Sequence, residues 1–392
     1  MARPLISRGV KQMKKKKIFV VAGARPNFMK IAPIVRAMDA SPAFETVIVH
    51  TGQHYDHNMS GSFFAELGIR RPDHNLEVGS GTHAFQTASV MMKFEEICLT
   101  DRPDYVMVVG DVNSTIAAGL VAKKLGASLI HVEAGLRSGD RQMPEEINRL
   151  ATDAITDIFF TTEKGATANL VSAGCDPGRV HFVGNVMIDN LFYQLGRLEA
   201  SAVSGEVATL KQSIRGNYIC LTMHRPSNVD NPEVLEAMLA ALGELAGEVP
   251  VLFPCHPRSR KNITRFGLDG YLSELPINGG TVKEGLLCMP PLGYNDFLYL
   301  WKDAALVITD SGGLQEETTA LEIPCITIRE NTERPVTVDV GSNLIVGSDG
   351  ERLKTESLKA LSGRWKPCTV PELWDGHAGE RITSVLEGAC GI

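Results

Sequence analysis

The chain has 392 residues, of which 44% are hydrophobic and 22% charged, and its formal net charge is −7. This length is too great for one ordinary core and favours two domains, while the composition is that of a soluble globular protein. The acidic balance argues against nucleic acid as the main partner, and no apolar run is long enough to span a membrane.

The first residues and the cysteines bear on where the protein works. The start, MARPLISRGVKQMKKKK, is basic and is not followed by a signal-peptide pattern, so we expect residues 1–17 to form a disordered, solvated extension. The eight cysteines are scattered without a CxxC pair, and several lie in apolar runs, as Cys220 does in YICLTM. This usage favours reduced thiols and a cytoplasmic protein.

In the first half of the chain, short β-branched runs alternate with stretches of helical character. Strands are expected at 17–23, 46–52, 104–111, 128–135, 157–163 and 179–185. Helices are expected near 27–40 and 58–67, after residue 111 with Gly126 as the C-cap, and from the segment MPEEINR onward. This rhythm predicts a parallel sheet with helices on both faces.

The same pattern restarts after a polar stretch near 194–215. The segments NYICLTMHR (217–225), VPVLFPCHPRSR (249–260) and LVITDSGG (306–313) indicate further strands, and a helix is expected near 231–247. We therefore predict an α/β protein with two Rossmann-like domains whose parallel sheets face each other across a cleft. The expected domains are 18–190 and 191–371, joined near 185–215, with a last helix at about 372–390 packing back onto the first domain.

Polar side chains follow nearly every predicted strand, which is where open parallel sheets bind ligands. Each has an ordinary structural interpretation when taken alone: Asp111 could cap a helix, Glu145 and Arg149 could form an i,i+4 ion pair, and His224 could be structural. Their convergence on one cleft favours a functional site instead. The first half contributes Arg25, Lys30, Asp111 and Glu133, and the second contributes His224, His256 and Ser311.

The histidines at positions 50, 54 and 57 raise the question of a metal site. Gly52 and the end of the predicted strand break the helical spacing that would bring them together, so we expect no metal site there.

The turn Ser311-Gly312-Gly313 lies between a buried strand and a helix. Its amides would point at an anion with the help of the helix dipole. Glu317 follows at about 6 Å along the helix axis, where a carboxylate can accept hydrogen bonds from vicinal hydroxyls. A phosphate joined to a ribose satisfies both groups, which predicts a nucleoside diphosphate. The ordinary interpretation is that the glutamates only offset the helix dipole.

The first domain supplies three carboxylates, Asp111, Glu133 and Glu145, with cations nearby. Such a set suits the removal and return of protons. A G-x-G-x-x-G fingerprint is absent after the first strand, where GARPNF stands, so hydride transfer to a dinucleotide is not indicated.

At these residues the sequence resembles the non-hydrolysing UDP-N-acetylglucosamine 2-epimerases. The matching segments run in order and are GARPNFMKIAP, TGQHYDHNMS, GDVNST, HVEAGLRSGD, MPEEINR, GNVMIDNL, HRPSN, HPRSR, TDSGGLQEE, TERP and GHAGERI. The resemblance implies a two-domain fold like that of the B-type glycosyltransferases, with a UDP-sugar in the cleft. It also implies a homodimer, no metal or redox cofactor, and a role in polysaccharide biosynthesis.

The implied reaction interconverts UDP-GlcNAc and UDP-ManNAc. UDP is eliminated to give a 2-acetamidoglucal and is then added back on the opposite face. The resemblance places Lys30, Asp111, Glu133, Glu145 and His224 at catalytic positions. Our hypothesis is that Asp111 and Glu133 handle the C2 proton, while Glu145 and His224 serve the hydroxyl and leaving-group side.

The resemblance also implies the substrate contacts. Arg25 and His256 would hold the diphosphate with the amides of Ser311, Gly312 and Gly313, and Glu317 would bind the ribose. Uracil would be lined by Leu292 and Phe297, and Arg334 would contact the sugar-phosphate end. Arg149 is also expected to bind the substrate.

One segment departs from the family pattern, because QHYDHNMS stands where many members have QHREML. Gln53 and His54 lie where some relatives bind a second, activating UDP-GlcNAc, and Tyr55 replaces the usual arginine-type residue. The segment also resembles a branch acting on UDP-2,3-diacetamido-uronic acids, although TERP favours UDP-GlcNAc.

The same residues leave three competing functions open. The first is a B-type glycosyltransferase, which would use a UDP-sugar without exchanging its C2 hydrogen. The second is a nucleotide-sugar-binding regulator without catalysis, although a sensor has no need of three proton-handling carboxylates. The third is a hydrolysing epimerase, whose members generally lack the HVEAGLR and TERP pattern present in this chain.

Overall fold

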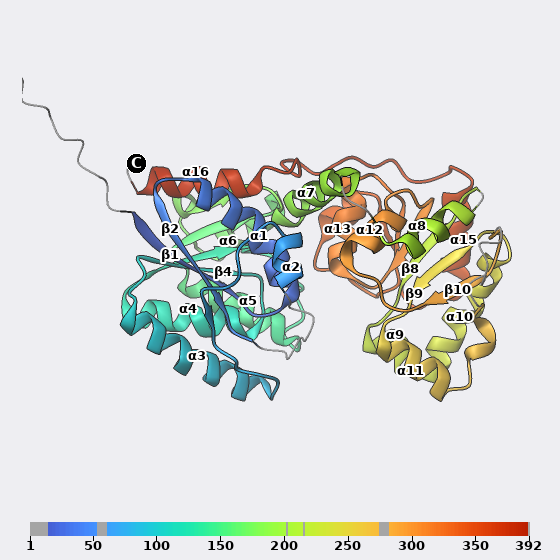
Figure 1. The fold of residues 1–392 in the computed structure, drawn as a ribbon, viewed down its shortest axis with the longest axis horizontal. Helices are drawn as coiled ribbons and strands as arrows, with labels where there is room; N and C mark the ends of the chain where they lie inside the picture. Colours follow the sequence, from blue (N-terminus) through green and yellow to red (C-terminus); the bar gives the residue numbers. More distant parts are fainter. Residues whose placement is uncertain (1–14, 53–60, 201–202, 215, 274–281, 391–392) are drawn as a thin grey trace, which may run out of the picture.

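The computed structural model describes residues 15–52, 61–200, 203–214, 216–273 and 282–390. Two lobes stand side by side, and each is built on a parallel sheet flanked by helices (Figure 1). The expected fold class, α/β with two Rossmann-like parallel sheets, is confirmed. Across the described ranges, every helix is too short or too polar to cross a membrane.

The sheet of the N-terminal lobe has seven strands in the order β3-β2-β1-β4-β5-β6-β7. Pairing begins at Lys16 with Phe44, two residues before the expected start of the domain. The strand order reverses between β1 and β4, which makes the gap beyond their carboxyl ends the natural ligand position. The strands are β1 Lys16–Ala22, β2 Phe44–His50, β3 His74–Asn75, β4 Tyr105–Val109, β5 Ser128–Val132, β6 Ile158–Thr161 and β7 Val180–Phe182.

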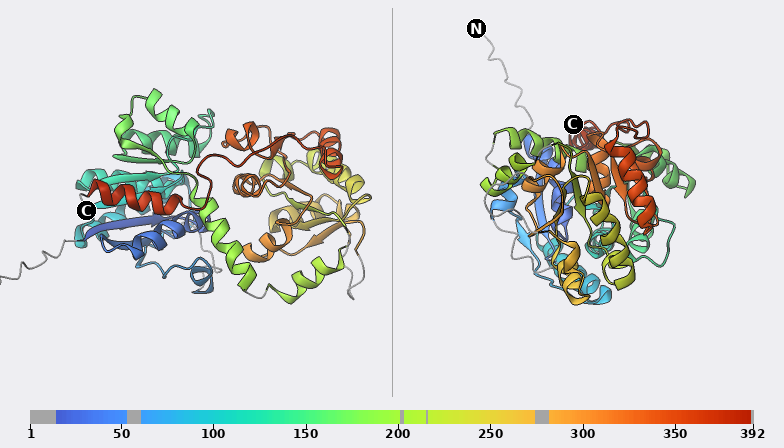
Figure 2. Two further views of the ribbon diagram at one scale, coloured as in Figure 1. Left: turned by 90° about the horizontal axis from the view of Figure 1, so that it is seen from above. Right: turned by 90° about the vertical axis from the view of Figure 1, so that its right-hand side faces the viewer.

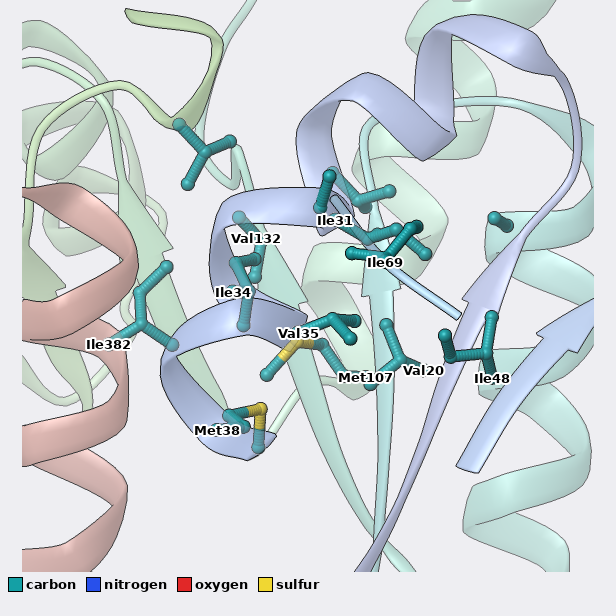
Figure 3. Packing of buried hydrophobic residues seen from close by; sticks show 14 of the residues in the cluster. Val20, Ile31, Ile34, Val35, Met38, Ile48, Ile69, Met107, Val132 and Ile382 are labelled. Atoms are coloured by element: carbon teal, nitrogen blue, oxygen red, sulfur yellow. The ribbon is translucent and has the colours of Figure 1, made fainter. Parts of the chain in front are cut away.

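Helices cover both faces of this sheet because its central strands are apolar on both sides. Along β1, Val20 belongs to the cluster under α1, whereas Phe19 and Val21 belong to the cluster on the other face. Figure 3 shows Val20 and Met107 of the sheet beneath Val35 of α1. The helices are α1 Arg25–Ala40, α2 Gly61–Glu66, α3 His83–Thr100, α4 Asn113–Leu125, α5 Pro144–Ile155 and α6 Lys164–Ser172, with a 3-10 turn at Pro177–Arg179.

The sheet of the C-terminal lobe has six strands in the order β10-β9-β8-β11-β12-β13, so its reversal lies between β8 and β11. The strands are β8 Ile219–Thr222, β9 Val251–Pro254, β10 Leu286–Met289, β11 Leu306–Thr309, β12 Cys325–Thr327 and β13 Asn343–Ile345. The helices are α9 Pro226–Val229, α10 Pro232–Ala246, α11 Pro257–Arg265, α12 Tyr294–Trp301, α13 Gly312–Ala320, α14 Pro335–Asp339 and α15 Gly350–Leu361, with a 3-10 turn at Asp269–Tyr271.

The join between the lobes contains two helices, α7 Val186–Ala200 and α8 Gly205–Ser213, where the sequence suggested a polar connection. Helix α7 contacts both α1 and α13, so the expected boundary between 190 and 191 falls inside an element shared by the lobes. Its inner face is apolar at helical spacing: Ile188 and Leu191 are fully buried, with Leu195 packed beside them.

The chain returns to the first lobe through its last helix, α16 Ala378–Ala389, which packs against α1 (Figure 2). Ile382 joins the core beneath α1 (Figure 3). Asp189 of α7 accepts the Ala378 and Gly379 amides at 3.1 and 2.7 Å, and so satisfies free N–H groups at the start of α16. This arrangement ties the start of the last helix to the junction of the lobes.

Candidate active site

A cavity of about 620 Å³ lies between the lobes, beyond the carboxyl ends of both sheets. It is lined by residues of both lobes, which places the two sets of predicted side chains around one space. The predicted residues that line it are Lys30, Asp111, Glu145, Arg149, His224, His256, Leu292, Phe297, Ser311, Gly312, Gly313, Glu317 and Arg334.

The remaining predicted residues stand elsewhere. The Glu133 carboxylate lies behind the cavity wall, in contact with Lys30. Arg25 at the start of α1 places its guanidinium carbon 5.0 Å from the centroid of the Phe63 ring, a cation–π arrangement apart from the described cavity lining. Gln53 and His54 lie outside the described residues.

Glu133 is the most constrained residue of the site. It is 4% exposed and has a φ of 65°, a left-handed conformation that a non-glycine residue adopts at a cost. Its Oε2 lies 2.5 Å from Lys30 Nζ, and its Oε1 lies 3.5 Å from Arg334 Nη2. Burial favours the neutral acid, but these two cations outweigh burial and lower the pKa of Glu133. The carboxylate is therefore ionised beside Lys30.

Arg334 reaches across the site from the loop before α14. Besides Glu133, its guanidinium contacts Glu316 Oε1 at 2.9 Å, and Asn185 donates to the same oxygen at 3.0 Å. Burial raises the pKa of Glu316, and the charge of Arg334 opposes that effect. One guanidinium thus serves two buried carboxylates from different lobes.

Asp111 follows β4 and is held by Arg149. The Arg149 guanidinium lies 2.5 Å from Asp111 Oδ2 and 2.9 Å from Glu146 Oε2. The partner of Arg149 on its own helix is therefore Glu146, three residues away, and not Glu145 as the i,i+4 interpretation supposed. Glu145 is exposed to the cavity instead, where its carboxylate is free to meet a ligand.

A buried histidine that the sequence analysis did not select supports Asp111 from behind. His131 on β5 is fully buried, with Nδ1 at 2.8 Å from Asp153 Oδ1 and Nε2 at 2.9 Å from the Gly110 carbonyl oxygen. Arg137 contacts the other oxygen of Asp153 at 2.7 Å. The HVEAG segment placed His131 at a strand end, but only the packing shows that its ring fixes the peptide before Asp111.

In the C-terminal lobe, His224 is oriented by Asp310. Its Nδ1 lies 2.9 Å from Asp310 Oδ1, while Asp310 Oδ2 accepts the main-chain N–H groups of His224 and Arg225 at 2.8 Å each. Burial favours the neutral form of Asp310, but the bond with His224 and the two amides outweigh burial. The net effect lowers the pKa of Asp310, so the aspartate is ionised. A proton on His224 Nδ1 leaves the Nε2 lone pair available. Asp310 was missed as a functional residue, although it precedes the Ser311 turn.

The Ser311 turn begins helix α13, as the sequence predicted. A Cβ atom on Gly312 would lie 2.9 Å from Arg334 Nη1, so glycine allows the arginine to approach the turn. The Ser311 amide, predicted to hold the anion, donates instead to the Thr309 hydroxyl at 2.9 Å. The helix N-terminus faces the cavity, where the amides that follow and the helix dipole favour an anion.

Glu317 lies one turn into α13 and accepts a hydrogen bond from the Tyr294 hydroxyl at 2.6 Å. Burial raises the pKa of Glu317 to about 8. Leu292 and Phe297 line the cavity beside Tyr294, and together they form an apolar wall near this carboxylate.

His256 caps α11, and its Nδ1 accepts the Arg258 amide at 3.2 Å. Burial lowers the pKa of His256, and the neighbouring His224 lowers it further. A neutral His256 with Nδ1 engaged as an acceptor carries its proton on Nε2, so it can donate to an anion held at the Ser311 turn.

The histidine set considered for metal binding is only partly described. His50 is buried with its ring 5.1 Å from that of Phe28, and burial lowers its pKa to about 4. His54 and His57 lie outside the described residues. Within the portion of the chain that the structure describes, no cluster of three or more His, Cys, Asp or Glu side chains has the arrangement of a metal site.

Comparison with known proteins gives consistent matches along the chain. Residues 36–387 match the family model described as UDP-N-acetylglucosamine 2-epimerase. A UDP-N-acetylglucosamine 2-epimerase of Methanococcus maripaludis is 39% identical over 378 residues, covering 95% of this chain and 98% of the relative. The UDP-2,3-diacetamido-2,3-dideoxy-D-glucuronate 2-epimerase of Pseudomonas aeruginosa is 36% identical, covering 94% of this chain and 99% of the relative.

A solved structure has the same architecture. It is the UDP-GlcNAc 2-epimerase of Methanocaldococcus jannaschii in complex with UDP-GlcNAc and UDP, which is 39% identical to this chain. The superposition has a TM-score of 0.81 and covers 95% of this chain and 99% of the other. Both lobes are therefore shared with that structure.

Proposed function

Because this chain belongs to the UDP-N-acetylglucosamine 2-epimerase family, we propose that its cleft binds UDP-GlcNAc and inverts C2 to give UDP-ManNAc. The family match confirms the resemblance found in the sequence and makes the chain an isomerase. One observation carries the substrate assignment. A single cavity joins the anion-binding N-terminus of α13 and Glu317 to the acid–base groups Lys30 and Asp111 of the other lobe.

In this proposal the C-terminal lobe, residues 191–371, holds the nucleotide. The diphosphate accepts hydrogen bonds from the amides at the start of α13 and from His256. The ribose hydroxyls face Glu317, which the Tyr294 hydroxyl already orients, and uracil packs on the apolar wall that includes Phe297. Because the pKa of Glu317 is raised, its carboxyl can be protonated or ionised near neutral pH. It accepts hydrogen bonds from the ribose hydroxyls in either state and can also donate one when it is protonated.

Residues 18–190, together with the last helix, supply the acid–base groups. A base removes the C2 proton, the C1–O bond breaks with its electron pair passing to the UDP phosphate, and a C1–C2 double bond forms. In the return step UDP oxygen attacks C1 while a proton is delivered to the opposite face of C2. We assign the C2 proton to Asp111, which lines the cavity, and to Glu133, which acts from behind the cavity wall through its contact with Lys30.

The leaving phosphate gains charge as the C1–O bond breaks, and that charge must be neutralised in a site with little water. Arg334 and the N-terminus of α13 place positive charge beside the leaving phosphate. Glu145 and His224 line the same cavity, and we assign them to the hydroxyl and leaving-group side. Arg149 contributes by holding Asp111, with which it is in contact at 2.5 Å.

A second substrate, a UDP-2,3-diacetamido-uronic acid, is favoured by the QHYDHNMS segment and by the 36% identical relative from Pseudomonas aeruginosa. The two substrates differ at C3 and C6 of the sugar. The TERP segment, which contains Arg334, makes UDP-GlcNAc our first choice.

The test is incubation with UDP-GlcNAc in heavy water, followed by NMR of the anomeric and C2 signals. Deuterium at C2 together with UDP-ManNAc is the expected result. Free ManNAc with UDP would indicate hydrolysis, and transfer without C2 exchange would indicate a glycosyltransferase. Binding without turnover would identify a regulator, and turnover of only the diacetamido-uronic substrate would select that branch.

We also propose a homodimer that uses α3. Phe85, Met92 and Leu99 are seven residues apart along this helix and are 55, 61 and 55% exposed. Residues at this spacing lie on one side of a helix, so they form an apolar stripe that a second copy can cover. We call these three residues the α3 stripe.

Four further parts of the proposal concern compartment, pathway, cofactors and regulation. We place the reaction in the cytoplasm, because the cysteine usage suits a reducing compartment. Its product would supply polysaccharide biosynthesis, and no metal or redox cofactor takes part. Activation by a second UDP-GlcNAc at Gln53 and His54 stays a prediction, since these residues are outside the described ranges.

A further inference from the structure

A second cavity, of about 470 Å³, lies beside the nucleotide side of the cleft and contains two cysteines. Cys255 follows β9 and Cys288 lies within β10, and both line this cavity together with Arg260. Pro291 lines both this cavity and the candidate active site. The two cavities therefore adjoin at Pro291.

Strand pairing brings the two thiols together. Cys288 stands opposite Phe253 in the parallel register, and Cys255 comes two residues after Phe253, just beyond the end of β9. Residues two apart in extended chain share a face, so both cysteines lie on the same side of the sheet. The Cys255 amide donates to the Met289 carbonyl at 2.9 Å, which fixes the pairing at this end. The Cys255 thiol donates to the His256 carbonyl oxygen at 3.8 Å and also interacts with the Cys288 sulfur.

The surroundings make Cys288 the more reactive thiol. The hydrogen bond from Cys255 and the charge of Arg260 outweigh burial and lower the pKa of Cys288 to about 7. Burial raises the pKa of Cys98 and Cys325 to about 12, so those thiols stay protonated. A thiolate with its pKa near ambient pH is well suited to attack a disulfide.

We propose that Cys255 and Cys288 form a thiol-modification site for small disulfides such as glutathione disulfide, and that the disulfide formed between them weakens nucleotide binding in the cleft. The Cys288 thiolate attacks one sulfur of the small disulfide and releases one thiolate. Cys255 then gives up its proton and attacks the Cys288 sulfur, which releases the second thiolate. The protein loses two electrons and two protons, and the small disulfide becomes two thiols.

The link to the nucleotide rests on the proposed function and on the position of His256. A disulfide needs its two Cβ atoms about 3.8 Å apart, with a dihedral angle near 90°. His256 directly follows Cys255, while Pro290 and Pro291 follow Cys288 by two and three residues. Drawing the two cysteines together therefore moves one residue assigned to the diphosphate and one segment that lines the cleft.

The experiment uses the full chain, treated with glutathione disulfide, trapped with N-ethylmaleimide and mapped by peptide mass spectrometry. We expect a cross-linked pair of peptides containing Cys255 and Cys288. Calorimetry with UDP as the probe is expected to show affinity reduced roughly tenfold, since a precise site tolerates little displacement. Dithiothreitol should restore both readings.

Two variants sharpen the result. Cys288→Ser should form no cross-link and keep its UDP affinity after treatment, while Cys255→Ser should stop at a glutathione adduct on Cys288. Cys325→Ser, a change at another buried cysteine, should behave like the unmodified sequence. Alkylation of both Cys255 and Cys288 after treatment would overturn the modification site, and a cross-link with unchanged UDP affinity would overturn its coupling to the cleft.

The outcomes also separate this inference from the proposed function. Cross-linking is measured by mass spectrometry and UDP binding by calorimetry, and neither measurement depends on turnover. A reduced protein that binds UDP but leaves UDP-GlcNAc unchanged would refute the epimerase assignment alone. An active epimerase without the cross-link would refute the modification site alone.

Discussion

Arg334 of the C-terminal lobe lies 3.5 Å from Glu133 of the N-terminal lobe, although 201 positions separate them in the chain. The same guanidinium contacts Glu316 at 2.9 Å, so it is shared by carboxylates on both sides of the cleft. This contact links the geometry of the proton-handling groups to the lobe that is proposed to hold UDP. It is therefore the first place to test how the two lobes work together.

Replacing Arg334 by methionine should destabilise the protein by about 3 kcal/mol, because buried Glu316 loses its cation and Glu133 keeps only Lys30. The measurement is urea unfolding at neutral pH. The matched control is Arg258→Met, since Arg258 pairs with Asp230 at the surface, where solvent screens the attraction and the loss should be far smaller. Equal losses in the two variants would contradict the role given to Arg334.

Asp111→Asn should lower kcat by roughly 10²–10⁴-fold, since the amide cannot take a proton. Exchange of the C2 hydrogen with deuterium should fall in parallel. Asp104→Asn makes the same change just before the other end of β4, outside the cavity, and should leave both rates intact. Unchanged C2 exchange in Asp111→Asn would remove this residue from the proton transfer.

His131→Phe should lower kcat roughly tenfold with little change in KM, because the peptide before Asp111 loses its support while the UDP lobe is untouched. The Gly110 carbonyl and Asp153 Oδ1 lose their partner, while Arg137 still contacts Asp153 Oδ2, so the change should also cost about 1–3 kcal/mol of stability. His181→Phe, on edge strand β7, is the control for removing a histidine from this sheet. A change in KM alone would argue against a positioning role.

Glu317→Gln should make stability less dependent on pH. Burial raises the pKa of Glu317 from 4.5 to about 8, so the folded protein keeps a proton that the unfolded chain releases between these values. Stability from this group therefore falls as pH rises from 4.5 to 8, by an amount on the order of a few kcal/mol.

The glutamine side chain does not titrate, so the variant lacks this pH-dependent contribution to stability. Its amide oxygen still accepts the Tyr294 hydrogen bond. Glu316, the neighbouring charge, is common to both proteins, so the comparison isolates Glu317. Unfolding free energies at pH 5 and pH 8.5 should show the variant gaining on the parent as pH rises. Glu284→Gln, at an exposed site, should follow the parent, and parallel curves for Glu317→Gln and the parent would refute the shift.

Met92→Glu should convert the proposed dimer into a monomer, because it buries a charge at the centre of the α3 stripe. Sedimentation velocity gives the mass directly. Val370→Glu places the same charge on an exposed apolar residue of the other lobe and should leave the dimer intact. A Met92→Glu protein that still sediments as a dimer would move the interface elsewhere.

Much of the fold was predictable because its signals are local. Strands β1, β4, β5 and β11 are apolar runs ending in polar residues, and Pro, Gly and helix-forming residues mark the helices that follow. The order of these elements indicated two parallel sheets, and ligands bind beyond the carboxyl ends of such strands. That rule alone brought Lys30, Asp111, His224 and Ser311 into one site.

The pairing of those side chains was decided only by tertiary structure. Arg149 has two carboxylates within reach on its own helix, and the choice of Glu146 follows from the position of Asp111 after β4. Arg25 contacts Phe63 because α2 packs near the start of α1. The sequence alone determined which chemical groups reach the strand ends, since alternation and turns are local. Which of these groups touch depends on strand register and on how the lobes meet, and those are set by packing between residues far apart in the chain.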